Sequence, residues 1–146
     1  MSAVPVKLGQ RVAFSKTVSE SDVYLFAGIT GDLAPNHVDE AYMATTAYGR
    51  RIAHGALLVG YMSRCSTAII AQAQPADDGA VPVSLGYDRV RFVGAVFIGD
   101  TITVRYEVTA IDEVKRRATA KVAITNQRGE TVAVAEHILK WVAPPG

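Results

Sequence analysis

The sequence contains one cysteine, Cys65, so an intramolecular disulfide is excluded. Cys65 stands inside an apolar run, which indicates a buried thiol whose ionised form is disfavoured and which fits a reducing compartment. The sequence also lacks the roughly 18 uninterrupted apolar residues of a membrane-spanning helix. Its beginning, MSAVPVKLGQRV, has no apolar core of the kind found in signal peptides. We therefore expect a cytoplasmic protein without a membrane partner.

A surplus of positive charge is also missing. Fifteen Lys and Arg residues against fourteen Asp and Glu residues leave a formal net charge of +1. A nucleic-acid-binding surface needs a concentration of basic residues that this balance does not supply. We therefore exclude nucleic acid as a partner.

Repeats and low-complexity linkers are absent too, and 146 residues fit one domain, which we place at 1–146. The segment 72–80, QAQPADDGA, contains Pro, Gly and two Asp residues and predicts a loop. This loop separates a first half with mostly helical or irregular patterning from a second half in which apolar and polar residues mostly alternate.

Two helices are predicted in the first half. Ser19 and Asp22 form a capping-box pattern that starts a short helix, and Gly31-Asp32 ends it. The segment 55–73, GALLVGYMSRCSTAIIAQA, is apolar nearly all round, with Arg64 as its one charged residue. A helix that is apolar on every face is normally surrounded by other structure, so this segment predicts a central buried helix.

Strands are predicted near 11–18 and, in the second half, near 81–92, 101–111, 118–125 and 131–141. In TITVRYEVTAI the apolar residues Ile102, Val104, Tyr106, Val108 and Ala110 share one face. Asn126 and Gly129 suit a hairpin turn between the last two strands. The sequence therefore predicts an α+β fold, with a largely antiparallel sheet curved around the long helix. Its edge strands favour pairing with a second copy, so we expect a homodimer.

The loop GDLAPNH contains the strongest candidates for chemistry. Pro35 biases Ala34 towards an extended conformation, so Asp32 and His37 cannot share one continuous helix and belong to a loop. A carboxylate can accept a proton from water while an imidazole orients the same water molecule. Such a pair can add water across a conjugated double bond.

The segments FAGITGDLAPNHVDEAYM, RRIAHGALLVGYMSR and YDRVRFVGAVFIGDTI together resemble the MaoC-like family, the (R)-specific enoyl-CoA hydratases. The resemblance covers nearly the whole chain. The family's hydratase motif runs G-D-x-N-P-(aliphatic)-H, and Gly31, Asp32, Pro35 and His37 occupy matching positions. Two positions depart from it: Ala34 stands where the family usually has Asn, and residue 36 is Asn where the family usually has an aliphatic residue. The loss of that Asn places the rate and the substrate range in question.

The resemblance implies a hot-dog fold and the reversible syn hydration of trans-2-enoyl-CoA to (3R)-3-hydroxyacyl-CoA, without a metal or redox cofactor. Asp32 and His37 are then the catalytic pair and an acyl-CoA is the substrate. Gly55 begins the buried helix, where a backbone N–H can stabilise enolate charge on the thioester oxygen as an oxyanion hole does. Ser63, two turns further on, matches by position a serine that some family members place beside the pair.

Two other functions remain open at this point. A hot-dog acyl-CoA thioesterase would use a carboxylate to direct water to the thioester carbonyl instead of C3. A non-catalytic acyl-CoA-binding subunit would keep the fold and lose the chemistry, with Ala34 as a sign of decay.

For several other residues a structural role is expected in place of a catalytic or binding role. His54 could be a second base, but its place beside Gly55 favours a structural role at the start of the helix, and His137 is expected to be structural within a strand. Residues 94–100 lack a phosphate-loop motif and predict a turn. Arg89 and Arg91 are expected on one face of a strand, in solvent, although they could also reach a CoA phosphate. The spacing of His37 and Asp39 fits no known zinc site, so no metal is expected.

Overall fold

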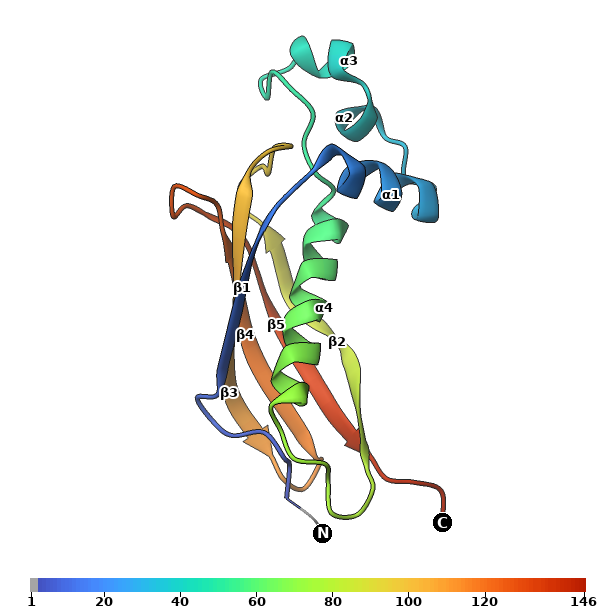
Figure 1. Cartoon of the computed structure of the whole chain (residues 1–146), viewed down its shortest axis with the longest axis vertical. Helices are drawn as coiled ribbons and strands as arrows, with labels where there is room; N and C mark the ends of the chain where they lie inside the picture. The colour runs from blue at the N-terminus through green and yellow to red at the C-terminus, as the bar shows by residue number, and fades with distance from the viewer. Residues whose placement is uncertain (1–2) are drawn as a thin grey trace.

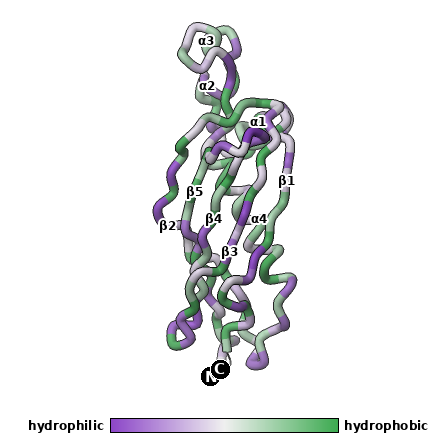
Figure 2. Tube along the Cα trace, turned by 90° about the vertical axis from the view of Figure 1, so that its left-hand side faces the viewer, coloured by the Kyte–Doolittle hydropathy of each residue, from purple (hydrophilic) through white to green (hydrophobic). Residues whose placement is uncertain are grey.

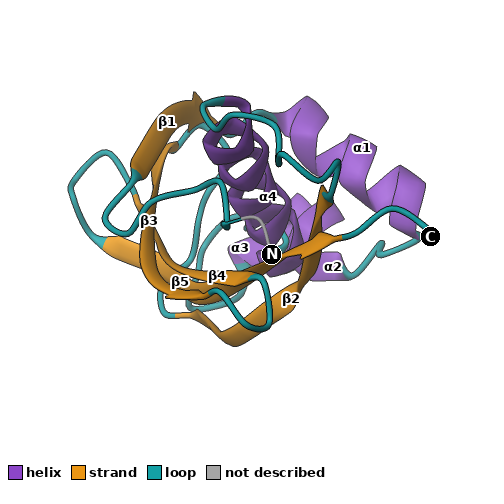
Figure 3. Cartoon of the chain, turned by 90° about the horizontal axis from the view of Figure 1, so that it is seen from below, coloured by secondary structure: helices purple, strands orange, loops and turns teal. Residues whose placement is uncertain are grey.

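The structure is a computed structural model that describes residues 3–146. Its five-stranded antiparallel sheet has the order β1-β3-β4-β5-β2 and curves around the long helix α4 (Figures 1 and 3). The strands are β1 (Arg11–Thr17), β2 (Val81–Phe92), β3 (Thr101–Asp112), β4 (Arg117–Thr125) and β5 (Thr131–Val142). The helices are α1 (Glu20–Thr30), α2 (Pro35–Val38), α3 (Glu40–Ala44) and α4 (Gly55–Ala71). The predicted α+β architecture with a sheet wrapped around one helix is confirmed.

The core lies between the concave face of the sheet and α4. Alternate residues of the strands face the helix, and Figure 2 shows the resulting mixture of apolar and polar residues along the chain. From the helix, the buried apolar residues are Leu58, Met62, Cys65 and Ile69. Burying these side chains removes apolar surface from water, which is the dominant favourable term in folding. Among the described residues, no helix is long and apolar enough to cross a membrane.

Several predicted boundaries shift. The long helix ends at Ala71, two residues before its predicted end. In β3 the first four predicted residues of the inner face are buried, but Ala110 is exposed because the register with β4 shifts between Val108 and Ala110. Such a bulge reverses which face a side chain takes. The prediction for Ala110 was therefore wrong.

The prediction that Arg89 and Arg91 share one face of a regular strand was also wrong. Arg89 has a positive φ of 52°, and the register of β2 against β5 shifts between Asp88 and Arg91. Arg89 is exposed and forms an ion pair of 3.2 Å with Glu136, in agreement with the expected solvent-facing role.

The helices α1, α2 and α3 form a cap beyond one end of the sheet, at the N-terminal end of α4 (Figure 1). The predicted capping box starts α1: the Asp22 amide donates to Ser19 Oγ (3.1 Å), and the Ser19 amide donates to the Asp22 carboxylate (3.0 Å). Arg51 ties this cap together, because its guanidinium donates to Glu20 and Tyr24 of α1 and to Glu40 of α3.

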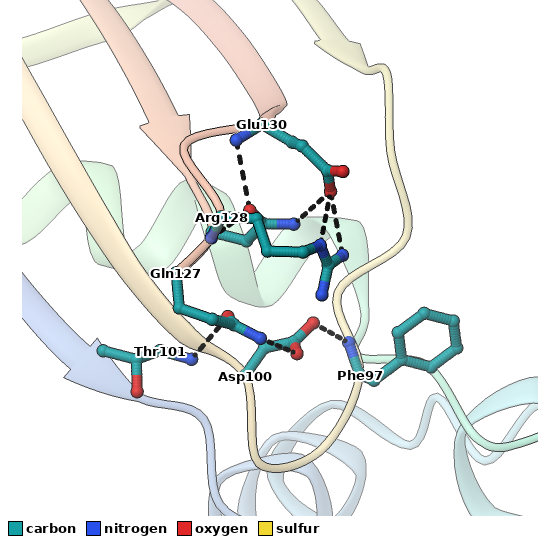
Figure 4. Close-up of polar contacts among 7 residues, drawn as sticks. Phe97, Asp100, Thr101, Gln127, Arg128 and Glu130 are labelled. Atoms are coloured by element: carbon teal, nitrogen blue, oxygen red, sulfur yellow. Dashed lines mark hydrogen bonds and ion pairs between the residues drawn. The ribbon is translucent and has the colours of Figure 1, made fainter.

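The segment 94–100 is a turn, as predicted, and it is fixed by the buried carboxylate of Asp100 (Figure 4). This carboxylate accepts hydrogen bonds from the Phe97 amide (2.9 Å) and from Gln127 Nε2 (2.9 Å). Gln127 in turn accepts from the Thr101 amide (3.1 Å). The turn also contacts the residues before α4, because the Ala53 amide donates to the Val96 carbonyl (2.7 Å). It therefore forms a fixed wall beside the start of α4.

Candidate active site

The loop that follows α1 places Asp32 at the surface. Gly31 ends α1 in the left-handed conformation (φ 77°), and the Asp32 amide donates to Thr30 Oγ1 at 3.2 Å. The Asp32 side chain is exposed, and its carboxylate accepts a long 3.4 Å hydrogen bond from the Ala34 amide. The carboxylate is thus free to accept a further hydrogen bond from water.

His37 lies in α2, a single helical turn that begins at Pro35, so the prediction of an irregular loop was wrong for this residue. Proline suits the first position of a helix because the N–H that it lacks would have no partner there. The His37 side chain is 7% exposed, and its Nδ1 lies 2.7 Å from the Ile52 carbonyl oxygen. Since a carbonyl oxygen can only accept, Nδ1 carries the hydrogen, and Nε2 of the neutral ring has a free lone pair.

His54, the residue before α4, lies against both members of the predicted pair. Its ring stacks on the His37 ring with centroids 3.7 Å apart and an interplanar angle of 27°. Its Nε2 lies 3.0 Å from the Asp32 carbonyl oxygen. The side chain makes no capping hydrogen bond to α4, although a role at the start of that helix was expected. These contacts join residues far apart in the sequence, so no pattern within one segment could predict them.

A pocket of about 340 Å³ opens beside His37 and Gly55. Its wall consists of Asn36, His37, Tyr48, Ile52, Ala53, Gly55, Leu58 and residues 92–96. Asp32 is outside this lining. Larger hollows of about 580 and 540 Å³ lie over β1, β3 and β4 and beside the N-terminal segment, but no histidine lines them. The candidate catalytic residue His37 therefore identifies the 340 Å³ pocket as the candidate active site.

Phe92 is a pocket residue that the sequence analysis did not single out. A Cβ placed on Gly55 would lie 2.5 Å from a ring carbon of Phe92, so the absence of a side chain at Gly55 makes room for this ring. The sequence predicts that a ligand group can approach the Gly55 backbone closely. In this structure the ring of Phe92 makes that close approach.

Ser63 is placed away from the other predicted site residues. It lies eight residues beyond Gly55 on α4, about 12 Å along the helix axis. Its side chain is exposed and lies near the hydroxyl of Tyr87 on β2, outside the lining of the pocket. The structure thus brings together Asp32, His37 and Gly55 but does not bring Ser63 to them.

Three potential metal ligands meet at this site. Donor atoms of Asp32, His37 and His54 all lie within 4.8 Å of one another. The two rings are stacked, however, and a ring nitrogen directs its lone pair within its own plane, so the pair cannot point both lone pairs at a common ion. Asp39 has another role, because its carboxylate accepts from the Tyr42 amide (2.9 Å) and caps α3.

A family model described as the MaoC-like domain matches residues 4–131. An (R)-specific enoyl-CoA hydratase of Rhodospirillum rubrum is 39% identical over 120 residues, which cover 82% of this chain and 78% of that protein. An (R)-specific enoyl-CoA hydratase of Aeromonas caviae is 36% identical over 140 residues, which cover 96% of this chain and 98% of that protein.

The solved structure of the (R)-hydratase from A. caviae involved in PHA biosynthesis superimposes with a TM-score of 0.81 at 33% identity. The match covers 92% of this chain and 96% of that chain. Because this agreement extends over nearly all of the sheet and helix, the predicted hot-dog fold is confirmed. The family model, the two relatives and the shared fold lead to one conclusion: the chain belongs to the MaoC-like family.

Proposed function

We propose that this protein is an (R)-specific enoyl-CoA hydratase, which adds water reversibly to trans-2-enoyl-CoA and yields (3R)-3-hydroxyacyl-CoA. The observation that carries the proposal is that donor atoms of Asp32 and His37 lie within 4.8 Å of each other. They lie beside the pocket that His37 and the first residue of α4 line, and Nε2 of His37 is free. The relatives named (R)-specific enoyl-CoA hydratase support the same reaction.

In the proposed mechanism, one water molecule donates hydrogen bonds to the Asp32 carboxylate and to Nε2 of His37. The water oxygen forms a bond to C3 of the enoyl group while one of its protons passes to Asp32. The electron pair of the C2=C3 bond moves towards the thioester carbonyl, and the proton is then delivered to C2 on the same face. One water thus supplies both the hydroxyl group and the hydrogen.

The intermediate has enolate charge on the thioester oxygen, and the start of α4 is suited to it. The first backbone N–H groups of a helix have no intrahelical partner and carry partial positive charge. We propose that the Gly55 N–H donates to this oxygen, with Phe92 as the neighbouring pocket wall. We assign Ser63 no role in this proposed mechanism, since it is outside the pocket lining.

The proposed reaction requires no redox cofactor, because addition of water involves no net oxidation or reduction. It also uses no metal, because Asp32 and His37 are proposed to activate the water. We also propose that the enzyme is a homodimer, since β2 is an edge strand that exposes apolar side chains: Val81 is 57% exposed, Val83 38% and Leu85 47%. A cytoplasmic location belongs to the proposal as well, because the buried Cys65 is a free thiol.

The test is the loss of enoyl-thioester absorbance when the purified protein is mixed with crotonyl-CoA in the presence of EDTA. We expect the wild type to hydrate crotonyl-CoA and the Asp32→Asn and His37→Gln variants to be inactive. Asp39→Asn is the matched control, because this carboxylate caps α3 and lies in the same segment without facing the pocket.

Two other outcomes would contradict the proposal. Release of free thiol from acyl-CoA, without hydration, would assign the protein to the thioesterases. Tight binding of crotonyl-CoA without turnover, unchanged in Asp32→Asn, would identify a non-catalytic binding subunit.

A further inference from the structure

We propose that His54 is a positioning residue that fixes Asp32 and His37 relative to each other. His54 is 1% exposed, so its ring is enclosed by the surrounding residues. It contacts both residues, through a hydrogen bond to one and a ring stack on the other.

The contacts form a reciprocal pair between two segments. His37 donates from Nδ1 to the carbonyl of Ile52, and His54 donates from Nε2 to the carbonyl of Asp32. Between them the Ile52 amide donates to the Asn36 carbonyl at 3.0 Å. The segment 32–37 is thus attached to the segment 52–54, which continues directly into α4. His54 therefore fixes the position of the Asp32 backbone relative to the central helix α4.

The ring of His54 also has an aromatic neighbour in α1. Phe26 lies 4.7 Å from it, centroid to centroid, with a tilt of 52°. His54 is therefore in contact with the rings of both Phe26 and His37. Such packing limits the rotation of the His37 ring and keeps its Nε2 directed to one place. Misplacement of a reacting group by about 1 Å can lower a rate by about 100-fold.

The chemistry of His54 argues that the ring is not present for packing alone. Because the Asp32 carbonyl can only accept, Nε2 of His54 carries the hydrogen, and Nδ1 of the neutral ring is an acceptor. This Nδ1 is buried and has no hydrogen-bond partner within residues 3–146. A buried acceptor without a partner costs about 1–3 kcal/mol. A phenylalanine would pack without that penalty, but it could not hold the Asp32 carbonyl.

Three substitutions separate the two contacts. His54→Gln keeps an N–H group at a similar reach and loses the stacked ring, whereas His54→Phe keeps a stacked ring and loses the N–H group. His54→Leu loses both. We expect kcat on crotonyl-CoA to fall about 100-fold in His54→Leu and less in the other two, with KM changed less than about threefold. His137→Gln is the matched control, because His137 is another fully buried histidine that lies outside the pocket lining. It should lower the melting temperature and leave kcat unchanged.

A second measurement does not require activity. Long-range proton–nitrogen NMR of the imidazoles should show His37 as the Nδ1–H tautomer in the wild type. We expect its signals to shift or broaden in His54→Leu and to remain in His137→Gln. The kinetic part rests on the proposed hydratase function, but the NMR part does not, so an inactive wild type would overturn that function alone. Unchanged His37 signals in His54→Leu would overturn the positioning role, whether or not kcat falls. So would a loss of kcat that only follows the loss of folded protein, as a structural role predicts.

Discussion

Gly55 is the residue at which a single added methyl group should disturb the pocket most. A Cβ there would lie 2.5 Å from the ring of Phe92, which is 52% exposed and can swing outwards. We therefore expect the Gly55→Ala variant to fold, with the Phe92 ring displaced from its place in the pocket wall. The predicted result is a decrease in kcat/KM of about 10- to 100-fold, because the thioester is misplaced. Steady-state hydration of crotonyl-CoA measures it.

The same helix supplies the control for this prediction. Gly60 is exposed in α4, and a Cβ placed on it would have no atom within 4 Å. Gly60→Ala should leave kcat/KM unchanged and stabilise the protein by up to about 1 kcal/mol through helix propensity. Adding Phe92→Ala to Gly55→Ala removes the collision and should recover part of the loss. Full activity of Gly55→Ala would show that the ring position does not matter.

At the level of single residues, sequence reasoning succeeded where the information was local. Asp32, His37 and Gly55 were identified from short contiguous patterns, and the fold brings them to one end of α4. The contacts of His54 and Phe92 join segments that are distant in the chain. Those contacts depend on how α1, α4 and β2 pack together, so no pattern within one segment could indicate them.

The elements were predictable for a similar reason. Period-two alternation identified β3 and β4, and the capping box identified the start of α1. The errors about strand faces lie at two of the register shifts, after Val108 and after Asp88. A bulge is a mismatch between two paired strands, so the sequence of one strand does not reveal it.

The strand β2 leads to a prediction about association. It lies at the edge of the sheet and exposes Val83 and Leu85, whereas exposed edges normally carry charge or are covered. We expect the wild type to sediment as a dimer of the 15.6 kDa chain. The double variant Val83→Lys/Leu85→Lys should sediment as a monomer at the same concentration, because two charges at the edge oppose pairing. Analytical ultracentrifugation measures both.

Val114→Lys serves as the control for this variant. Val114 is 80% exposed in the turn between β3 and β4, so the change adds a charge at an apolar surface position away from β2. This variant should remain dimeric. A monomeric wild type, or a dimer that persists in the double variant, would exclude β2 as the site of association.

At the scale of the whole molecule, the buried histidine His137 should make the free energy of unfolding depend on pH. His137 is fully buried in β5, with Tyr106 Oη 2.8 Å from its Nδ1 and Ser84 Oγ 2.7 Å from its Nε2. Burial also raises the pKa values of Tyr106 and Tyr87. Burial disfavours the charged imidazole, and no anionic group within residues 3–146 offsets it, so the pKa of His137 is lowered from 6.5 to about 4.

The unfolded chain therefore binds a proton at His137 near pH 6.5, whereas the folded protein does not bind one until about pH 4. The resulting stability is fully present above pH 6.5 and is lost as the pH falls from 6.5 towards 4. Between pH 7.5 and pH 5 the expected loss of unfolding free energy from this residue is about 2 kcal/mol. Urea unfolding at the two pH values, followed by the fluorescence of the buried Trp141, measures it at a fixed protein concentration.

His137→Gln isolates the contribution of this histidine from that of the other titratable groups. The variant should be less stable at pH 7.5, because glutamine cannot meet both hydroxyl groups in the same geometry or stack on Tyr87 as the imidazole does. Its loss of stability between pH 7.5 and pH 5 should be smaller than that of the wild type by about 2 kcal/mol, because glutamine does not titrate. Equal losses in the two proteins would mean that His137 is protonated in the folded core and that the hydroxyl groups around it accommodate the charge.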